Sequence, residues 1–157
     1  MRHILKIHRT LQGLIPDTDH GFTIERFNPT VHKQDWLDLN NVIFAHHPDQ
    51  GNWVMKDLEN RMAEPWFDPA GFFLAVENGE LVGTCWTKIH HSLVNQPPVG
   101  ELYVVGTHPS HHGHGIARSV SITAMNYLFN KGILDAILYV DADNERALKL
   151  YDSLGFN

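Results

Sequence analysis

Hydrophobic and polar residues follow two different periods along this chain, and each period predicts one kind of element. Side chains that alternate, or stay apolar for a short run between turn signals, predict strands at 22–27, 71–76, 81–89, 100–105 and 136–140. Apolar residues spaced three or four apart predict helices at 36–43, 55–62, 116–128 and 147–154. The order strand, two helices, three strands, helix, strand, helix is typical of an α/β (α+β) fold, with a mixed central sheet flanked by helices.

Asparagine and glycine mark the ends of several of these elements. Asn78-Gly79 separates two predicted strands, and such a pair supplies the positive φ angles of a tight hairpin. Gly132 and Gly155 directly follow two predicted helices, where a glycine commonly forms the C-terminal cap. The sequence therefore predicts one hairpin at 71–89 and two helices that stop sharply.

The predicted strand at 100–105 carries two polar side chains with useful chemistry. With a period of two, Glu101, Tyr103 and Val105 share one face of this strand. Leu102 and Val104 share the other face. A carboxylate and a phenol are therefore expected on the same side of the sheet.

The length of 157 residues and a hydrophobic content of 43% predict a single compact domain. Residues 1–11 alternate like a strand, but a polar stretch with a proline, 16–21, separates them from the rest. We therefore assign 1–20 to an N-terminal strand and linker, a candidate for the tail of a preceding domain, and 21–157 to the main domain.

Charge and hydropathy narrow the classes of function. Twelve Lys and Arg residues against 18 Asp and Glu give a net charge of −6, and no window gathers the basic residues that a nucleic-acid surface requires. The apolar runs are shorter than the ~20 residues of a bilayer-spanning helix, and the N-terminus lacks a signal-peptide core. We expect a cytoplasmic protein without nucleic-acid or membrane partners. The single cysteine, Cys85, lies in a strand-like segment and is interpreted as a packed thiol rather than a nucleophile.

Twelve histidines raise the question of a metal site. Four of them surround one Pro-Ser pair, namely His108, His111, His112 and His114. Consecutive loop residues that lead into a helix seldom converge in the tetrahedral geometry of a closed zinc site, and no cysteine pair lies nearby. We predict no metal and interpret these imidazoles as side chains of a solvated loop.

A glycine-rich segment at 112–117, His-Gly-His-Gly-Ile-Ala, lies between a predicted strand and a predicted helix. Small residues at such a junction let successive backbone N–H groups approach an anion, and the helix dipole favours negative charge there. The segment is therefore a candidate phosphate cradle that needs no lysine. A purely structural glycine turn is the alternative that this segment alone leaves open.

Two ordered motifs carry a family resemblance. Residues 112–117 match the Gln/Arg-x-x-Gly-x-Gly/Ala motif that GNAT acetyltransferases carry at a strand–helix junction, except for His112 in the first position. Residues 144–156 match the second signature of that family, Asn-x-x-Ala-x-x-x-Tyr-x-x-x-Gly-Phe. The sequence therefore resembles the GNAT family, which implies the GNAT fold, N-acetyltransferase activity and acetyl-CoA as cosubstrate.

The resemblance also implies which residues hold acetyl-CoA. The residues that end strand 100–105 and follow it are implied to pair with the pantetheine arm, 112–118 to cradle the pyrophosphate, and 144–149 to line the CoA channel. His112 is implied to act mainly through its backbone. The implied cofactor-binding residues are Val105, Gly106, Thr107, His112, Gly113, His114, Gly115, Ile116, Ala117, Arg118, Asn144, Glu145, Arg146, Ala147, Leu148 and Lys149.

Further segments narrow the resemblance to the mycothiol synthases, a branch of the GNAT family. They are 46–51, 64–72, 86–88, 100–106 and 138–144, and the similarity runs from about residue 22 to the end. Mycothiol synthases are tandem GNAT proteins whose C-terminal domain acetylates, and 1–12 resemble the last strand of the preceding domain. The family continues past Gly-Phe into a further strand. We therefore expect a companion N-terminal GNAT-like domain in the full-length protein, and a catalytic domain here that lacks its last strand.

The same resemblance implies the reaction and its residues. Acetyl would pass from acetyl-CoA to the cysteinyl amine of 1D-myo-inositol 2-(L-cysteinylamino)-2-deoxy-glucopyranoside, the last step of mycothiol biosynthesis. Glu101 is implied as the base for the amine and Tyr151 as the acid for the departing thiolate. A solvated carboxylate and core packing are their respective alternatives. The implied substrate-binding residues are Asp49, which replaces the usual glutamate, Lys88, Glu101 and Tyr139.

Two other functions stay open beside this one. A GNAT enzyme that acts on another small amine or on a protein N-terminus would need the same phosphate cradle. A non-catalytic acyl-CoA-binding module that serves a partner domain would also keep the cradle and would lose only the chemistry.

Overall fold

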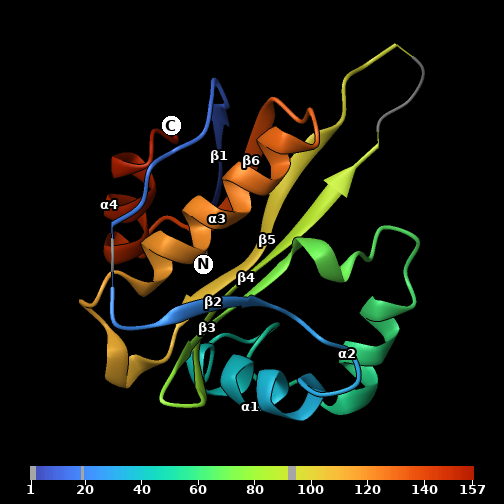
Figure 1. Ribbon diagram of the computed structural model, residues 1–157, viewed down its shortest axis with the longest axis vertical. Helices are drawn as coiled ribbons and strands as arrows, with labels where there is room; N and C mark the ends of the chain where they lie inside the picture. Colours follow the sequence, from blue (N-terminus) through green and yellow to red (C-terminus); the bar gives the residue numbers. More distant parts are fainter. Residues whose placement is uncertain (1–2, 19, 92–94) are drawn as a thin grey trace.

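A six-stranded sheet runs through the computed structural model, in which residues 3–18, 20–91 and 95–157 are described (Figure 1). The spatial order of the strands is β1-β6-β5-β4-β3-β2, and all neighbouring pairs are antiparallel except β5 and β6. The strands are β1 (Ile4–Thr10), β2 (Thr23–Arg26), β3 (Phe72–Glu77), β4 (Glu80–His90), β5 (Val99–Thr107) and β6 (Asp135–Asp141).

Helices cover both faces of this sheet, as Figure 1 shows. Helices α3 (Ile116–Asn130) and α4 (Glu145–Ser153) lie on one side, which we call the α3 face. Helices α1 (Lys33–Ile43) and α2 (Met55–Met62) lie on the other side, the α1 face. Two short 3-10 turns, η1 (Pro69–Gly71) and η2 (Pro109–His111), precede β3 and α3. The predicted fold class and the predicted order of elements from 22 onward are confirmed.

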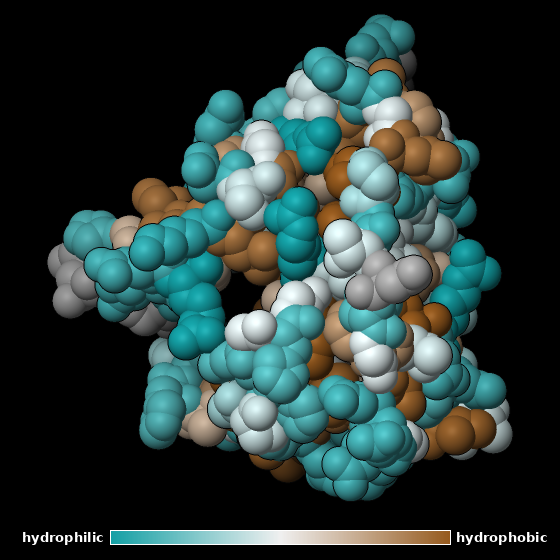
Figure 2. All heavy atoms as spheres, turned by 60° about the vertical axis from the view of Figure 1, so that its left-hand side comes forward, coloured by the Kyte–Doolittle hydropathy of each residue, from teal (hydrophilic) through white to brown (hydrophobic). Residues whose placement is uncertain are grey.

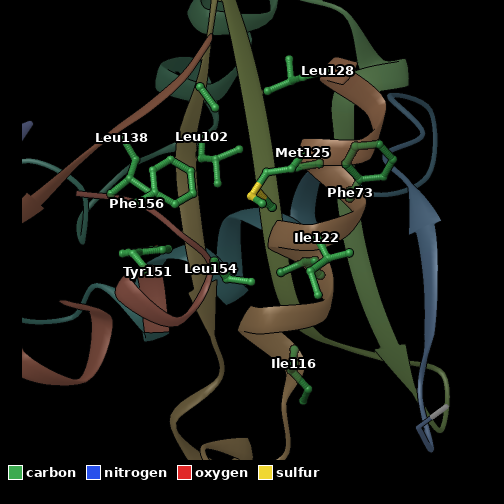
Figure 3. Packing of buried hydrophobic residues seen from close by; sticks show 14 of the residues in the cluster. Phe73, Leu102, Ile116, Ile122, Met125, Leu128, Leu138, Tyr151, Leu154 and Phe156 are labelled. Carbon is green, nitrogen blue, oxygen red and sulfur yellow. The ribbon is translucent and has the colours of Figure 1, made fainter. Parts of the chain in front are cut away.

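The two faces hold separate hydrophobic clusters. On the α3 face, side chains of α3 such as Ile122 and Met125 pack with Leu138 of β6 and Leu154 near the end of α4, as the close view in Figure 3 shows. On the α1 face, fully buried Trp36 and Trp86 form the centre of an aromatic cluster. Strands β3, β4 and β5 are therefore covered on both faces of the sheet.

Turn chemistry accounts for the predicted element ends. Asn78 and Gly79 have φ angles of 52° and 80°, which confirms the hairpin between β3 and β4. Gly132 and Gly155 have φ angles of 81° and 86° directly after α3 and α4, the left-handed conformation of a helix C-terminal cap. Both helix ends are therefore confirmed.

A bulge in β5 overturns the predicted faces of that strand. Trp86 of β4 pairs with Val104, and the next residue, Thr87, pairs with Leu102, so Tyr103 is an extra residue in β5. As a result Leu102 and Val105 pack on the α3 face, whereas Tyr103 and Val104 both pack on the α1 face. Strict alternation was wrong for Val104 and Val105, because an extra residue in one strand reverses the alternation beyond it.

The N-terminal segment forms an edge strand of the same sheet. β1 pairs with β6 over seven residues, from Ile4 opposite Asp141 to Thr10 opposite Asp135. Arg9 Nη1 donates to the carbonyl of Leu154 at 2.7 Å, which ties β1 to the end of α4. Assignment of 1–20 to a preceding domain stays a prediction, and Met1, Arg2 and Asp19 of that range lie outside the described residues.

On the side drawn in Figure 2, hydrophobic residues reach the surface among hydrophilic ones. Exposed large apolar side chains are scattered, and three of them, Leu14, Val31 and Leu134, lie in the connections between elements. Val42 of α1 belongs to this set at 43% exposed, although its spacing predicted burial; Leu37 is buried instead. Among the described residues, no helix is both long and apolar enough to cross a bilayer.

Candidate active site

The only parallel strand pair among the described residues parts after three residues. Register partners join Val99–Glu101 of β5 to Asp135–Ile137 of β6, and none follow, although the two strands run on to Thr107 and Asp141. The bulge at Tyr103 lies where β5 turns away from β6. A cleft therefore opens between the carboxyl ends of these strands, a place where α/β sheets commonly bind ligands.

The larger hollow of this cleft has a volume of about 480 Å³. Its wall comes from the end of β5, from the loop and first turn of α3, and from the start of α4. Most of the predicted cofactor-binding residues therefore meet around one hollow: Val105, Gly106, Thr107, His112, Gly113, Gly115, Ile116, Ala117, Arg118, Asn144, Arg146 and Ala147. The other predicted ones, His114, Glu145, Leu148 and Lys149, are not part of its wall.

The glycine-rich loop keeps its backbone open to this hollow. Gly113 and Gly115 have φ angles of 84° and 76°, which L side chains rarely adopt, and no atom lies within 4 Å of where a Cβ would stand on either residue. The first hydrogen bond across the start of α3 runs from Ser119 N to Gly115 O, and no side chain caps this helix. The amides of Ile116 and its two successors are thus orphan donors, and they favour an anion.

Two guanidinium groups add positive charge here, although the chain as a whole carries −6. Arg118 and Arg146 both border the hollow, and Arg118 Nη1 donates to Ser153 Oγ at 3.0 Å. Desolvation lowers the pKa of His112, and the charge of Arg146 lowers it further. Near neutral pH the imidazole is therefore a weak source of charge, so backbone amides and arginines carry the anion binding.

Tyr151 stands where the larger hollow meets a smaller one of about 140 Å³, since it borders both. Its ring belongs to the α3-face cluster and its exposure is 6%. Burial raises the pKa of its hydroxyl, and nearby Cys85 raises it further, so the group keeps its proton. The hydroxyl has no hydrogen-bond partner among the described residues. Tyr151 therefore belongs both to the core and to the wall of the cleft.

The smaller hollow lies where β5 and β6 part and has residues of both faces of the sheet in its wall, and we call it the passage. Leu138 and Tyr151 border it from the α3 face, and Tyr103 and Val104 border it from the α1 face. Tyr139, predicted to contact substrate, also borders it and is 52% exposed.

Glu101 and Lys88 lie opposite each other at the point where β5 and β6 part. The Glu101 side chain is 10% exposed and points to the α1 face, as does Lys88, whose Nζ lies 5.4 Å from the centre of the Tyr103 ring. Neither residue borders the two hollows, and Asp49 does not either. Asp49 follows α1, where its carbonyl accepts from Trp53 Nε1 at 3.2 Å.

Sequence reasoning missed two residues of the cleft wall. Ile43 and Phe44, at the end of α1, border the larger hollow because α1 packs against Gly106, where a Cβ would lie 2.5 Å from Ile43 Cγ2. Only packing between distant segments brings them to the cleft. His90, which contacts Glu101, was also missed, although its place two residues after Lys88 predicts the same face.

The histidine loop is held by hydroxyl contacts. Ser110 Oγ lies 2.8 Å from His108 Nδ1 and 2.9 Å from His111 Nδ1. Within the described part of the chain, no three His, Cys, Asp or Glu side chains are grouped in a way that could hold a metal ion.

Comparisons with known proteins agree with this geometry. The chain is 46% identical to the mycothiol acetyltransferase of Catenulispora acidiphila over 142 residues, which are 90% of this chain and 45% of that protein. The chain spans about half the length of the curated relatives it matches. A GCN5-related N-acetyltransferase from Sphaerobacter thermophilus has the same fold, with a TM-score of 0.78 at 24% identity over 99% of this chain and 48% of that one.

A second solved structure is similar over most of its length. The aminoglycoside N-acetyltransferase AAC(6')-Iy in complex with CoA superposes with a TM-score of 0.69 at 25% identity, covering 92% of both chains. The model of the Acetyltransferase (GNAT) family matches residues 30–156. With its parted strands, its open glycine loop and this match over most of its length, the chain belongs to the GNAT family of acetyltransferases.

Proposed function

We propose that this domain transfers the acetyl group of acetyl-CoA to the cysteinyl amine of 1D-myo-inositol 2-(L-cysteinylamino)-2-deoxy-glucopyranoside, which completes mycothiol. The single observation that carries acetyl-CoA binding is the hollow bordered by the open amides at the start of α3. The acceptor is inferred from relatives named mycothiol acetyltransferase, which are 42–46% identical to this chain. Because those relatives are about twice as long, a companion N-terminal domain of the full-length protein is part of the proposal.

The residues of the larger hollow suit the parts of acetyl-CoA. The amides at the start of α3, with Arg118 and Arg146 beside them, would hold the diphosphate. The free edge of β5 from Val105 to Thr107 would pair with the amides of the pantetheine arm, since this stretch has no register partner in β6. The thioester would then reach the passage bordered by Tyr151.

Two proton movements are assigned to the chain itself. The α-amine of the acceptor has a pKa of about 8, so it is mostly protonated near neutral pH and must lose a proton before it attacks. Glu101 takes that proton from the α1 face, where Lys88 and Tyr139 orient the acceptor. Tyr151 donates its proton to the sulfur as the CoA thiolate departs, and its buried hydroxyl keeps that proton until then.

One experiment tests the transfer and the acceptor together. The chain is incubated with acetyl-CoA and a panel of amines that includes the cysteinyl glucosaminide, an aminoglycoside and a peptide with a free N-terminus, and the products are weighed by mass spectrometry. We expect acetylation of the cysteinyl glucosaminide at the amine. If only another amine is acetylated, the cysteinyl glucosaminide is not the acceptor, and that other amine takes its place in the proposal.

Calorimetry with CoA separates the remaining outcomes. CoA binding without transfer to any amine would identify a non-catalytic acyl-CoA module. Absence of CoA binding by the folded chain would reject the proposal altogether.

A further inference from the structure

The buried carboxylate at the point where β5 and β6 part is bonded to an exposed imidazole. Glu101 Oε1 lies 2.7 Å from His90 Nε2. The side chain of Glu101 is only 10% exposed, whereas that of His90 is 42% exposed. The pair therefore spans the distance between an enclosed position in the sheet and solvent.

Strand pairing explains why these two residues meet. Glu101 lies opposite Lys88 in the antiparallel pair of β4 and β5, and His90 lies opposite Val99. His90 is thus the diagonal neighbour of Glu101 on the same face, a separation that a long side chain reaches. The contact is set by two strands in the middle of the sheet and needs no loop.

We propose that His90 is a positioning residue for Glu101: its Nε2–H donates to Oε1 and fixes the orientation of the carboxylate. The inference rests on the proposed function, because it takes Glu101 as the group that receives the proton of the amine. With Oε1 bonded to His90, the remaining oxygen Oε2 is the one left to face the acceptor. A carboxylate held in this way meets the amine in one orientation, which is what an efficient base requires.

One proton moves in each turnover, and His90 keeps its own. The ammonium of the acceptor gives one proton to Oε2 of the Glu101 carboxylate, while the Nε2–H of His90 continues to donate to Oε1. After the acetylated product leaves, Glu101 gives that proton to water through the exposed tenth of its side chain, and the carboxylate is restored. No bond between heavy atoms changes in this step, and one proton has moved from the amine to solvent.

The test compares two variants of His90 under saturating acetyl-CoA, with whichever amine the chain acetylates. His90→Ala removes the hydrogen bond to Oε1, and we expect kcat to fall by about 10- to 100-fold, with KM for acetyl-CoA within about twofold of wild type. His90→Gln keeps an N–H donor for Oε1, so it should recover part of the lost kcat. Added imidazole should raise the kcat of His90→Ala, since the exposed gap admits it.

The matched control is a second imidazole–carboxylate pair in the same sheet. His8 Nε2 lies 3.0 Å from Asp135 Oδ1, and the His8 side chain is 46% exposed, similar to His90. The partner of His8 is Asp135, to which no part in the reaction is assigned. His8→Ala should therefore leave kcat within about twofold of wild type and should not respond to imidazole.

The outcomes that overturn the proposal are separate from those that overturn the function. Wild-type kcat in His90→Ala rejects the role of His90. A kcat of His90→Gln no higher than that of His90→Ala rejects the hydrogen bond to Oε1 as the cause of the loss. A wild-type chain that acetylates no amine rejects the proposed function. Crystal structures of wild type and His90→Ala then still decide the positioning role, because an unmoved Glu101 carboxylate in the variant contradicts it.

Discussion

At the scale of single residues, removal of the Tyr151 hydroxyl distinguishes a role of this residue in proton transfer from its role in core packing. Its ring is packed in the core, yet its oxygen has no partner in the described part of the chain. Tyr151→Phe therefore removes a proton donor and no hydrogen bond. We expect kcat to fall by about 10- to 100-fold, while the free energy of unfolding changes by less than about 0.5 kcal/mol. Steady-state kinetics measure kcat, and urea titration measures the free energy of unfolding. An unchanged kcat would show that Tyr151 only packs in the core.

Glu101 gives a second prediction at this scale. Glu101→Gln keeps the size of the side chain and an oxygen for His90 but removes the base, so we expect kcat to fall by about 100-fold or more. Because Glu101 does not border the CoA hollow, the calorimetric affinity for CoA should stay at the wild-type value. Weaker CoA binding would show that the substitution disturbs the cleft, and full activity would show that another group takes the proton.

At the scale of elements, the loop before α3 depends on the backbone of its glycines. Gly115 has a φ of 76° with open space around its missing Cβ, so Gly115→Ala costs about 1 kcal/mol of conformational energy without a clash. A shift that relieves this strain would turn the first amides of α3 away from the hollow. We expect at least tenfold weaker CoA binding by calorimetry.

The hairpin between β3 and β4 supplies the matched control for this variant. Gly79 has a φ of 80°, also without an atom within 4 Å of its missing Cβ, and it does not border the hollow. Gly79→Ala should lose about the same free energy of unfolding and bind CoA like wild type. Equal losses of CoA affinity in both variants would mean that global stability, not the loop, governs binding.

The elements also show how far sequence patterns reach. Periodicity predicted the helices and strands from 22 to 154, and Asn78-Gly79 predicted the hairpin, because these signals lie within a few residues of each other. The faces of β5 beyond the bulge were wrong, since a bulge depends on the register with a neighbouring strand. The contact of His90 with Glu101 was missed for the same reason.

At the scale of the whole molecule, the rate at which the single cysteine reacts with a thiol reagent measures how often the folded structure opens. Cys85 is fully buried in the α3-face cluster, and burial raises the pKa of its thiol. We expect the native chain to react with a disulfide reagent only through opening of the structure, and the chain in urea to react at once with one equivalent.

Saturation with CoA provides the control for this prediction. A ligand that binds only the folded chain at about 100 times its Kd adds about 2.7 kcal/mol, so labelling governed by global opening should become about 100-fold slower. Fast labelling of the native chain would mean that the region around Cys85 opens locally.

The sequence by itself determined what depends on neighbours along the chain: the elements, the turn at Asn78-Gly79 and the flexible backbone of the glycine loop at 112–117. Only the tertiary structure decided where β5 parts from β6, which side chains turn to each face after the bulge, and that Tyr151 stands between the two hollows. These features join segments that are far apart in sequence, and their geometry follows from strand register and helix packing, for which no local pattern carries a signal.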